Sequence, residues 1–200
     1  MPDEIASYRQ AVQALLHERD EGTWAEQELD AALRAALAEL SHWSPQRRSA
    51  ELALSEGGWE IPLAGLAGLL WVEEIWLPYS SGSAPCPVPF EQREGRARLR
   101  TGQPASPGEV VRVLYAAIHT IAGLDGAQET SLPAALAPLL VQGAAGFAVL
   151  AKAAAMAREY SWPAGAAAQM TRWGSAMLAS FRQALSALRE PATAPWVSWG

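Results

Sequence analysis

One segment restricts the fold of this chain more than any other, because it is long, apolar and built almost entirely of small side chains. Residues 134–157 are rich in alanine, with Gly143-Ala144-Ala145-Gly146 near the centre and Lys152 as the one charged side chain. Alanine favours the α-helix, and small residues let a neighbouring helix approach closely. We therefore predict a helix over 133–160, with a kink or restart at Pro138. It should pack closely through Gly143, Ala144 and Gly146, within the protomer or against a neighbour.

The same segment has to be tested as a membrane span. Residues 132–151 contain Gln142 as the only clearly polar side chain, and a bilayer is spanned by about 20 apolar residues. However, alanine and glycine transfer into lipid weakly compared with Leu, Ile or Phe, and Pro133 and Pro138 lie inside the segment. We expect a buried helix and no membrane partner.

Composition limits the class of protein. Half of the 200 residues are apolar and 18% are charged, which predicts an ordinary globular domain with a core. The net charge of −6 argues against general binding of polyanions. Cys86 is the single cysteine, so no intramolecular disulfide forms, and no Cys/His cluster predicts a metal or another cofactor. The acidic N-terminus lacks a following apolar run and does not resemble a signal peptide.

Apolar periodicity predicts three further helical regions. Residues 5–17 form a short amphipathic helix, and a second helix follows Thr23-Trp24-Ala25-Glu26 and ends near Pro45. Thr23 and Glu26 have the spacing of a capping box, in which each side chain bonds the other's amide. A last helix is predicted over 164–189.

Between these helices the pattern changes to that of strands. We predict strands at 51–55, 59–61, 69–77 and 110–120, a hairpin of 88–93 with 96–100, and a proline-rich loop at 80–89. The predicted fold is mainly α (α+β): a helical bundle with an inserted small antiparallel β subdomain and an extended C-terminal tail. The expected divisions are 1–46, a helical hairpin; 47–122, the β subdomain; 123–189, the helices that complete the bundle; and 190–200, the tail.

The titratable side chains do not match the spacing of a known catalytic motif. His17, His42 and His119 lack the spacing of a metal or nucleophile motif, so we expect structural roles for them. Asp125 lies among glycines and is typical of a turn. The glycines of residues 143–146 lack the pattern of a phosphate loop. No carboxylate pair or nucleophile with its base is evident, and we expect the chain not to be an enzyme.

Two surface features have alternative interpretations. Arg96, Arg98 and Arg100 alternate along one strand, with Arg93 across the turn, and this face is either solvated or contacts phosphates, DNA or an acidic partner. The tail residues Pro195, Trp196, Val197 and Trp199 either fold back on their own domain or dock into another chain, since aromatic side chains are common anchors of interfaces.

In its order of elements, the chain resembles the head-to-tail connector (adaptor) proteins of tailed bacteriophages. The fragments that carry the resemblance are the following: 24–30, WAEQELD; 75–79, IWLPY; 108–115, GEVVRVLY, with His119-Thr120; 130–133, TSLP; 143–148, GAAGFA; and 181–185, FRQAL. Together they cover most of residues 5–189. Proteins of that family are largely helical with a variable β insertion, and they have no catalytic residues to carry over.

The resemblance implies a structural virion protein that forms a ring, of the dodecamer type, between the portal and the tail or neck proteins. DNA would then be passing cargo, and the protein would be found in the neck of the virion, and in the host cytoplasm during assembly. The tail residues would contact the portal. The alternative from the sequence is a helical protein–protein interaction module that is not viral.

Overall fold

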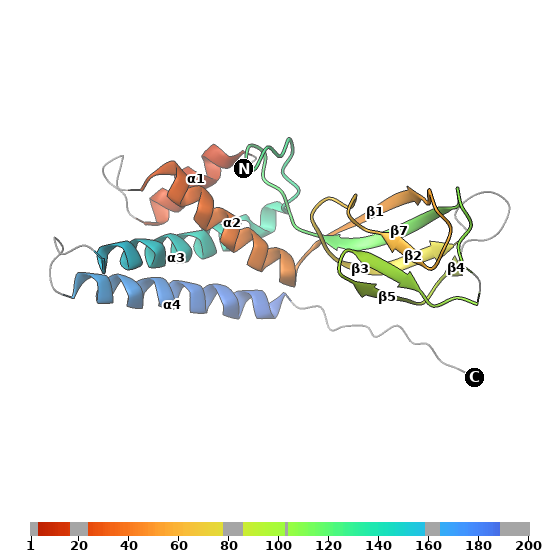
Figure 1. The fold of residues 1–200 in the computed structure, drawn as a ribbon. Helices are drawn as coiled ribbons and strands as arrows, with labels where there is room; N and C mark the ends of the chain where they lie inside the picture. Colours follow the sequence, from red (N-terminus) through yellow and green to blue (C-terminus); the bar gives the residue numbers. More distant parts are fainter. Residues whose placement is uncertain (1–3, 17–23, 78–85, 103, 159–164, 189–200) are drawn as a thin grey trace. The chain divides into compact units, whose positions relative to one another are not determined.

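The chain divides into two units, one helical and one of β structure. The computed structural model describes residues 4–16, 24–77, 86–102, 104–158 and 165–188. The helical unit is formed by Met1–Ser44 with His119–Gly200, and the β unit by Pro45–Ile118 (Figure 1). Helices in one unit and antiparallel strands in the other confirm the predicted α+β class. The predicted extended tail, 190–200, lies outside the described residues.

The helical unit is built around one central helix. Its elements are α1 (Ile5–Leu15), α2 (Glu26–Trp43), the 3-10 turn η1 (Ala134–Leu136), α3 (Ala137–Met156) and α4 (Ala166–Ala187). Helix α3 contacts α1, α2 and α4, and Figure 1 shows it lying beside α2 and α4. The core residues with no exposed surface include Val12, Leu29, Leu33, Leu40, Leu140, Val149, Phe181 and Leu185.

The contact between α3 and α4 depends on glycines in both helices. A Cβ atom on Gly143 would lie 2.8 Å from the Phe181 ring, and one on Gly146 would lie 2.8 Å from Leu178. In return, a Cβ on Gly174 of α4 would lie 2.9 Å from Leu150 of α3. Such distances are shorter than carbon atoms tolerate. The small-residue helix therefore packs closely inside its own protomer.

The start of α3 follows from Pro138. Proline fits the first turn of a helix, where its missing N–H is not needed. Here Pro138 lies in that turn, directly after η1, so the restart predicted from the sequence is confirmed. Among the described residues, one helical segment, Ala134–Met156, has the length and composition of a membrane span. In the structure it is the central helix of the bundle.

Helix α2 begins later than the sequence predicts. The predicted capping box includes Thr23, which lies outside the described residues. The helix starts at Glu26, and the side chain that reaches back is Glu28, whose Oε2 accepts the Ala25 amide at 3.0 Å. Glu26 instead accepts from Arg9 of α1 at 2.8 Å. The observed capping pair is therefore Ala25 with Glu28, and the predicted pair of Thr23 with Glu26 is not tested by the described residues.

Ion pairs join the outer helices to α2. Arg9 binds Asp30 through two parallel bonds, Nε to Oδ1 at 2.7 Å and Nη2 to Oδ2 at 2.8 Å. On α4, Arg182 Nε donates to Glu39 at 2.6 Å. The hydrogen bond that each guanidinium donates to its carboxylate raises the pKa of that guanidinium above its ordinary value. Two-point bonds of this kind fix the angle between helices as well as their distance.

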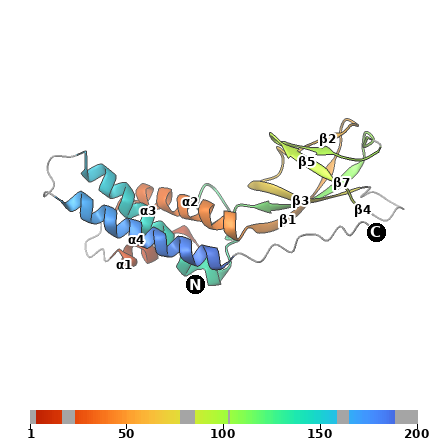
Figure 2. The ribbon, with the colours of Figure 1, turned by 90° about the horizontal axis from the view of Figure 1, so that it is seen from below.

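The β unit consists of two antiparallel sheets with a shared core. The first has the order β1 (Gln46–Ala53), β7 (Val110–Ala117), β3 (Leu69–Leu77) and β4 (Cys86–Pro87). The second has the order β2 (Glu60–Pro62), β6 (Arg96–Leu99) and β5 (Phe90–Arg93). Figure 2 shows β2 and β5 in a layer separate from β1 and β3. Buried side chains from both sheets, such as Ile75, Val113, Ile61 and Leu99, form one cluster.

The predicted strand at 69–77 and the hairpin around Glu94-Gly95 are confirmed, while two strand boundaries differ. The strand predicted at 51–55 begins at Gln46, because Gln46–Ala53 pairs over its whole length with β7. The strand predicted to end at 120 ends at Ala117. Of the loop predicted at 80–89, Cys86–Pro87 instead forms the short strand β4, which pairs with β3, and residues 80–85 lie outside the described residues.

The glycine contact predicts the response to one added methyl group. In an open helix, Gly→Ala stabilises by about 0.5–1 kcal/mol. In Gly143→Ala, overpacking against the buried Phe181 ring should reverse the sign and lower the free energy of unfolding by about 1–2 kcal/mol. Chemical denaturation measures this. Adding Phe181→Leu to the Gly143→Ala variant should recover the part of the loss that comes from the added methyl group, and a stabilised Gly143→Ala single variant would contradict the close packing.

Candidate functional site

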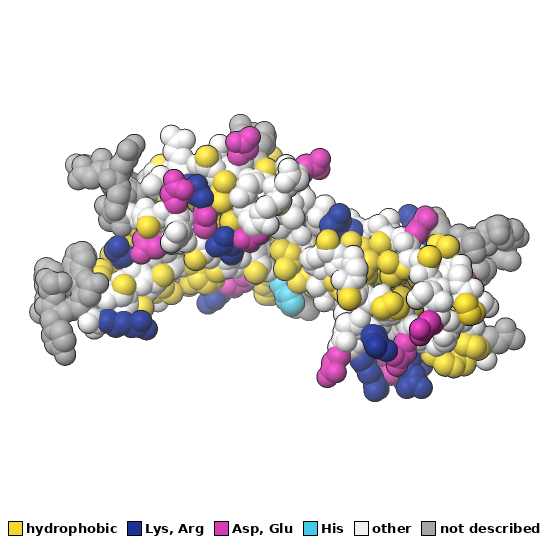
Figure 3. Space-filling model, turned by 45° about the horizontal axis from the view of Figure 1, so that its top comes forward, with side chains coloured by type: hydrophobic (Ala, Val, Ile, Leu, Met, Phe, Trp, Pro, Cys, Tyr) yellow, Lys and Arg dark blue, Asp and Glu magenta, His cyan; other side chains and the backbone are white. Residues whose placement is uncertain are grey.

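The hairpin arginines lie on one exposed face of the three-stranded sheet. Ala97 and Leu99 of β6 point into the core. Arg96 and Arg98 alternate with them and point outward, and Arg100 is exposed directly after the strand. Arg93, at the end of β5, pairs with Arg96 in the register. The shared face expected from the alternating spacing is therefore present. Figure 3 shows basic and acidic side chains gathered together at one edge of the β unit.

Two glutamates neutralise part of this face. Arg96 Nη1 lies 2.8 Å from Glu60 Oε2, across the β2–β6 pair. Glu91 of β5 accepts from Arg93 at 3.3 Å and also from Arg100. The hydrogen bond from Arg100, helped by the charges of Arg93 and Arg98, lowers the pKa of Glu91 below its ordinary value. The carboxylate therefore stays ionised, and three of the four arginines have an acidic partner.

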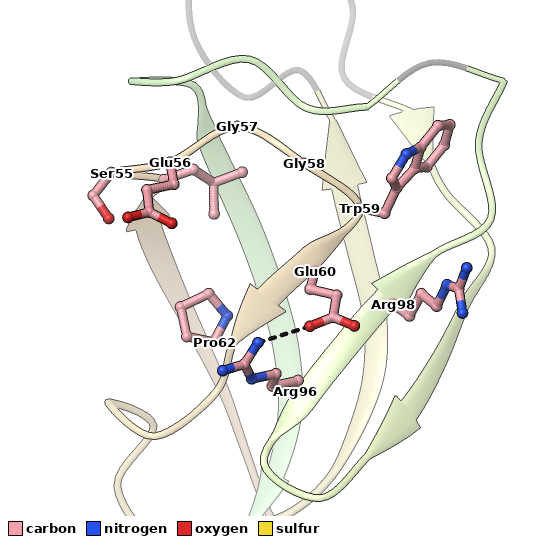
Figure 4. Close-up of a pocket in the computed structure, with 10 residues that line it drawn as sticks. Ser55, Glu56, Gly57, Gly58, Trp59, Glu60, Pro62, Arg96 and Arg98 are labelled. Carbon is pink, nitrogen blue, oxygen red and sulfur yellow. Dashed lines mark hydrogen bonds and ion pairs between the residues drawn. The ribbon is translucent and has the colours of Figure 1, made fainter.

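Arg98 is the exception. In the register it lies directly between Glu60 on one side and Glu91 on the other. Both carboxylates bind diagonally placed arginines instead, and Arg98 has no ion pair with any described residue. Figure 4 shows Arg96 turned toward Glu60, while Arg98 is turned away from that pair. The central guanidinium of the face is thus available to a ligand.

Two hollows in the surface meet at Arg98. One, of about 530 Å³, is lined by the loop 54–58 together with Trp59, Glu60, Arg96 and Arg98 (Figure 4). The other, of about 460 Å³, is lined by Glu91, Arg93, Arg100 and their neighbours, and again by Trp59 and Arg98. The Trp59 side chain is 38% exposed, which is unusual for so large an apolar group. A free cation and an exposed indole therefore share one place on the sheet.

The helical unit carries a different kind of surface between α2 and α3. An apolar hollow of about 420 Å³ is lined by Ala31, Ala35, Phe147, Ala151 and neighbouring residues, with Glu28 at its border. Its walls are small alanines, with the Phe147 ring partly exposed. Such a surface suits the close approach of another helix.

A second surface of small residues lies on the outer side of α4. One narrow row, Gly174, Leu178, Phe181 and Leu185, is buried. The opposite side is exposed and includes Arg172, Ala176, Ala179, Ser180 and Gln183. The 38% exposed Trp173 lies beside Ala176 and Ser180 at helical spacing. No acidic residue occurs in α4, and Arg182 is already bound by Glu39. Apart from Trp173, the outer face therefore consists of small or polar side chains and is slightly basic.

The other residues singled out from the sequence lie elsewhere. Gly143, Ala144 and Gly146 are buried in the bundle, so they form no external surface. The predicted partner-binding residues Pro195, Trp196, Val197 and Trp199 lie outside the described residues. No group of three or more His, Cys, Asp or Glu side chains that could hold a metal occurs among the described residues.

His119 lies at the point where the chain returns to the helical unit. It is 4% exposed, and its amide donates to Ser41 Oγ at 3.0 Å. Its Nε2 lies 2.9 Å from the Ser44 carbonyl, and its Nδ1 lies 3.1 Å from the Ser131 carbonyl and 3.3 Å from the Ser131 hydroxyl. Burial lowers the pKa of His119 below its ordinary value, and the two carbonyls oppose this in part. His119 thus ties the end of α2 to the segment before η1, as expected of a structural residue.

Sequence reasoning did not find Trp59 or the hollow between α2 and α3. The signal for Trp59 was its place directly after Gly57-Gly58, at the start of a strand, where an aromatic ring has no preceding side chain to cover it. The signal for the hollow was the pair Ala31 and Ala35, which share one side of a helix that is otherwise lined by leucines. Both depend on which neighbour lies opposite, which spacing alone does not give.

Comparison with known proteins finds similarity among solved structures. No family model matches the chain, and no curated protein matches it. A solved structure described as "Neck of empty GTA particle computed with C6 symmetry" contains a chain that is similar at 18% identity, with a TM-score of 0.32. The match covers 84% of this chain and 87% of that chain. A match at this TM-score does not assign a function to the chain.

The environment of His119 predicts a pH dependence of stability. Because its pKa is lower in the folded state than the ordinary 6.5, the unfolded chain binds the proton more readily. The stabilisation is complete above about pH 6.5 and is lost as the pH falls through the range between the two pKa values. Urea unfolding between pH 5 and 8 should show a smaller slope of stability against pH in His119→Gln. The exposed His42→Gln is the matched control, and equal slopes in both variants would contradict the prediction.

Proposed function

We propose that this protein is a structural adaptor of the neck of a phage-like particle, and that its helical units assemble side by side into a ring. The observation that carries the proposal is that the helical unit has two different surfaces of small residues. One is the hollow between α2 and α3, and the other is the outer face of α4. In the ring, α4 of one copy docks into the hollow of the next.

Ring symmetry is the reason why two different surfaces matter. A closed ring needs a head-to-tail interface, in which each copy presents one surface to the left neighbour and another to the right. A single self-complementary surface would give a dimer instead. The hollow is lined by α2 and α3, whereas the outer face belongs to α4, so one copy can use both surfaces at once.

The two surfaces are complementary in shape and charge. Exposed alanines and serines on α4 let it approach α2 and α3 closely, and Phe147 offers an apolar contact in the lining of the hollow. Arg172 is the charged residue on the outer face of α4, and Glu28 borders the hollow. An ion pair between these two side chains at the rim would fix the register of neighbouring copies.

The position of the ring within the particle rests on the order of elements in the sequence, which resembles that of the connector proteins. Under the proposal the ring lies between the portal and the tail or neck proteins, and DNA passes through it without being a ligand. The protein is made in the host cytoplasm and ends in the virion. No catalytic step belongs to this function, and the histidine that is most buried, His119, has a structural role.

Cysteine pairs test the interface directly. In a Cys86→Ser background, Ala31→Cys with Ala176→Cys should give a ladder of disulfide-linked oligomers at high protein concentration, because the two positions face each other across the proposed contact. The control pair, Ala53→Cys with Ala176→Cys, replaces the hollow by an exposed site in the β unit. Non-reducing gel electrophoresis separates the two. A ladder that is absent from the first pair, or equal in both, would contradict the interface.

Charge insertion tests assembly in the intact chain. Ala31→Glu and Ala176→Glu place a carboxylate in the hollow and on α4, and each should abolish ring formation, because the longer side chain would hold the two helices apart and its charge would lose water in the contact. Ala53→Glu is the matched control and should assemble normally. Light scattering coupled to size exclusion gives the mass of each species, in the presence and absence of the portal protein.

The tail has its own test. Deleting residues 190–200 should weaken binding to the portal protein while the thermal midpoint of the remaining chain stays unchanged, because the tail follows the last described helix. Co-purification with a tagged portal protein measures the binding. Portal binding equal to that of the full chain would exclude a role for Trp196 and Trp199.

A further inference from the structure

We propose that the outer face of the three-stranded sheet binds an acidic segment of a partner protein, with a carboxylate on Arg98 and an apolar side chain against Trp59. This inference goes beyond the adaptor function and does not depend on ring formation. It assigns a defined site to one of the four hairpin arginines, in place of a general basic face.

The charged side chains around the guanidinium of Arg98 pair with one another. Glu60 is bound by Arg96, and Glu91 by Arg93 and Arg100, so each neighbouring carboxylate is held away from Arg98. Four arginines and two glutamates leave the face with an excess of positive charge. A carboxylate that arrives from outside can form a two-point bond with Arg98 without displacing an existing pair.

Trp59 is held in place by the backbone around it. The Gly58 amide donates to the Ala105 carbonyl and the Ala105 amide to the Gly58 carbonyl, each at 2.9 Å. The carbonyl of Trp59 accepts from the Leu99 amide at 2.7 Å. A Cβ atom on Gly57 would lie 2.8 Å from the Ala105 oxygen and from Pro107, so the loop is packed without spare room. The indole is therefore presented on a rigid support, which lowers the entropic cost of binding.

The surrounding carboxylates favour an acidic peptide over nucleic acid. Glu56, Glu60 and Glu91 line the two hollows that meet at Arg98. A nucleic acid would bring successive phosphates against these groups, and the net charge of −6 would add repulsion. A segment in which single carboxylates alternate with apolar side chains places one charge on Arg98 and one apolar group on Trp59. It avoids the glutamates on either side.

The experiment uses fluorescence anisotropy with the full chain. The probe is a fluorescein-labelled hexapeptide, Glu-Leu-Glu-Leu-Glu-Leu, compared with the Gln-Leu-Gln-Leu-Gln-Leu peptide and with a labelled oligothymidylate. We expect saturable binding of the acidic peptide, weaker binding of the glutamine peptide, and still weaker binding of the oligothymidylate. Higher salt should weaken binding of the acidic peptide.

Matched variants locate the site. Arg98→Gln and Trp59→Ala should each weaken binding of the acidic peptide by roughly tenfold or more, as expected for loss of a charge-assisted hydrogen bond or of an aromatic anchor. Arg48→Gln and Trp43→Ala replace an exposed arginine and an exposed tryptophan elsewhere and should bind normally. Circular dichroism melting shows that each variant is folded.

Three results would overturn the proposal. They are the absence of saturable binding of the acidic peptide, binding that folded Arg98→Gln leaves unchanged, and tighter binding of the oligothymidylate than of the peptide. The last result would assign the face to nucleic acid. None of these results bears on ring formation, which the α2–α3 and α4 variants test separately.

Discussion

The close approach of α3 and α4 is the contact on which the helical unit depends. Each helix has a glycine where the other helix places a large side chain. Phe181 and Leu178 of α4 pack on Gly143 and Gly146 of α3, and Leu150 of α3 packs on Gly174 of α4. Because the glycine side of α3 is enclosed in this way, it cannot offer a surface to a partner. Because α4 is held by one narrow row, its opposite side stays exposed. The packing of large side chains on glycines thus forms the core between α3 and α4. It also leaves the outer face of α4, one of the two surfaces proposed for assembly, exposed.

In the β unit, the ion pairs of the three-stranded sheet determine which arginine is left without a carboxylate. The register places Glu60 and Glu91 directly beside Arg98, yet both glutamates bind diagonal neighbours. Exposed ion pairs contribute little stability, about 0–1 kcal/mol each. Their effect here is on arrangement, because they fix three arginines and leave the central one without a carboxylate beside the exposed Trp59.

The sequence predicts most elements but few of the contacts between them. Periodicity and proline positions are local signals, and they give α2, the 69–77 strand and the restart at Pro138. The strand at Gln46–Ala53 was found only in part, because its first residues are polar and its partner, β7, is distant in the chain. The spacing of Arg96, Arg98 and Arg100 shows that they share a face. Which of them lacks a carboxylate depends on β2 and β5, and no local pattern carries that information.

The His119 contacts hold the two ends of the inserted β unit close together. The β unit begins after Ser44 and ends before His119, and these two residues are joined by a 2.9 Å hydrogen bond within the helical unit. Inside the β unit, Gln46 and Ala117 at the ends of the insertion are also paired. Removal of residues 45–118 therefore leaves a gap that a short turn can close, at small entropic cost. Closely spaced ends of this kind are the arrangement in which a module can be inserted into a domain without separating the elements around it.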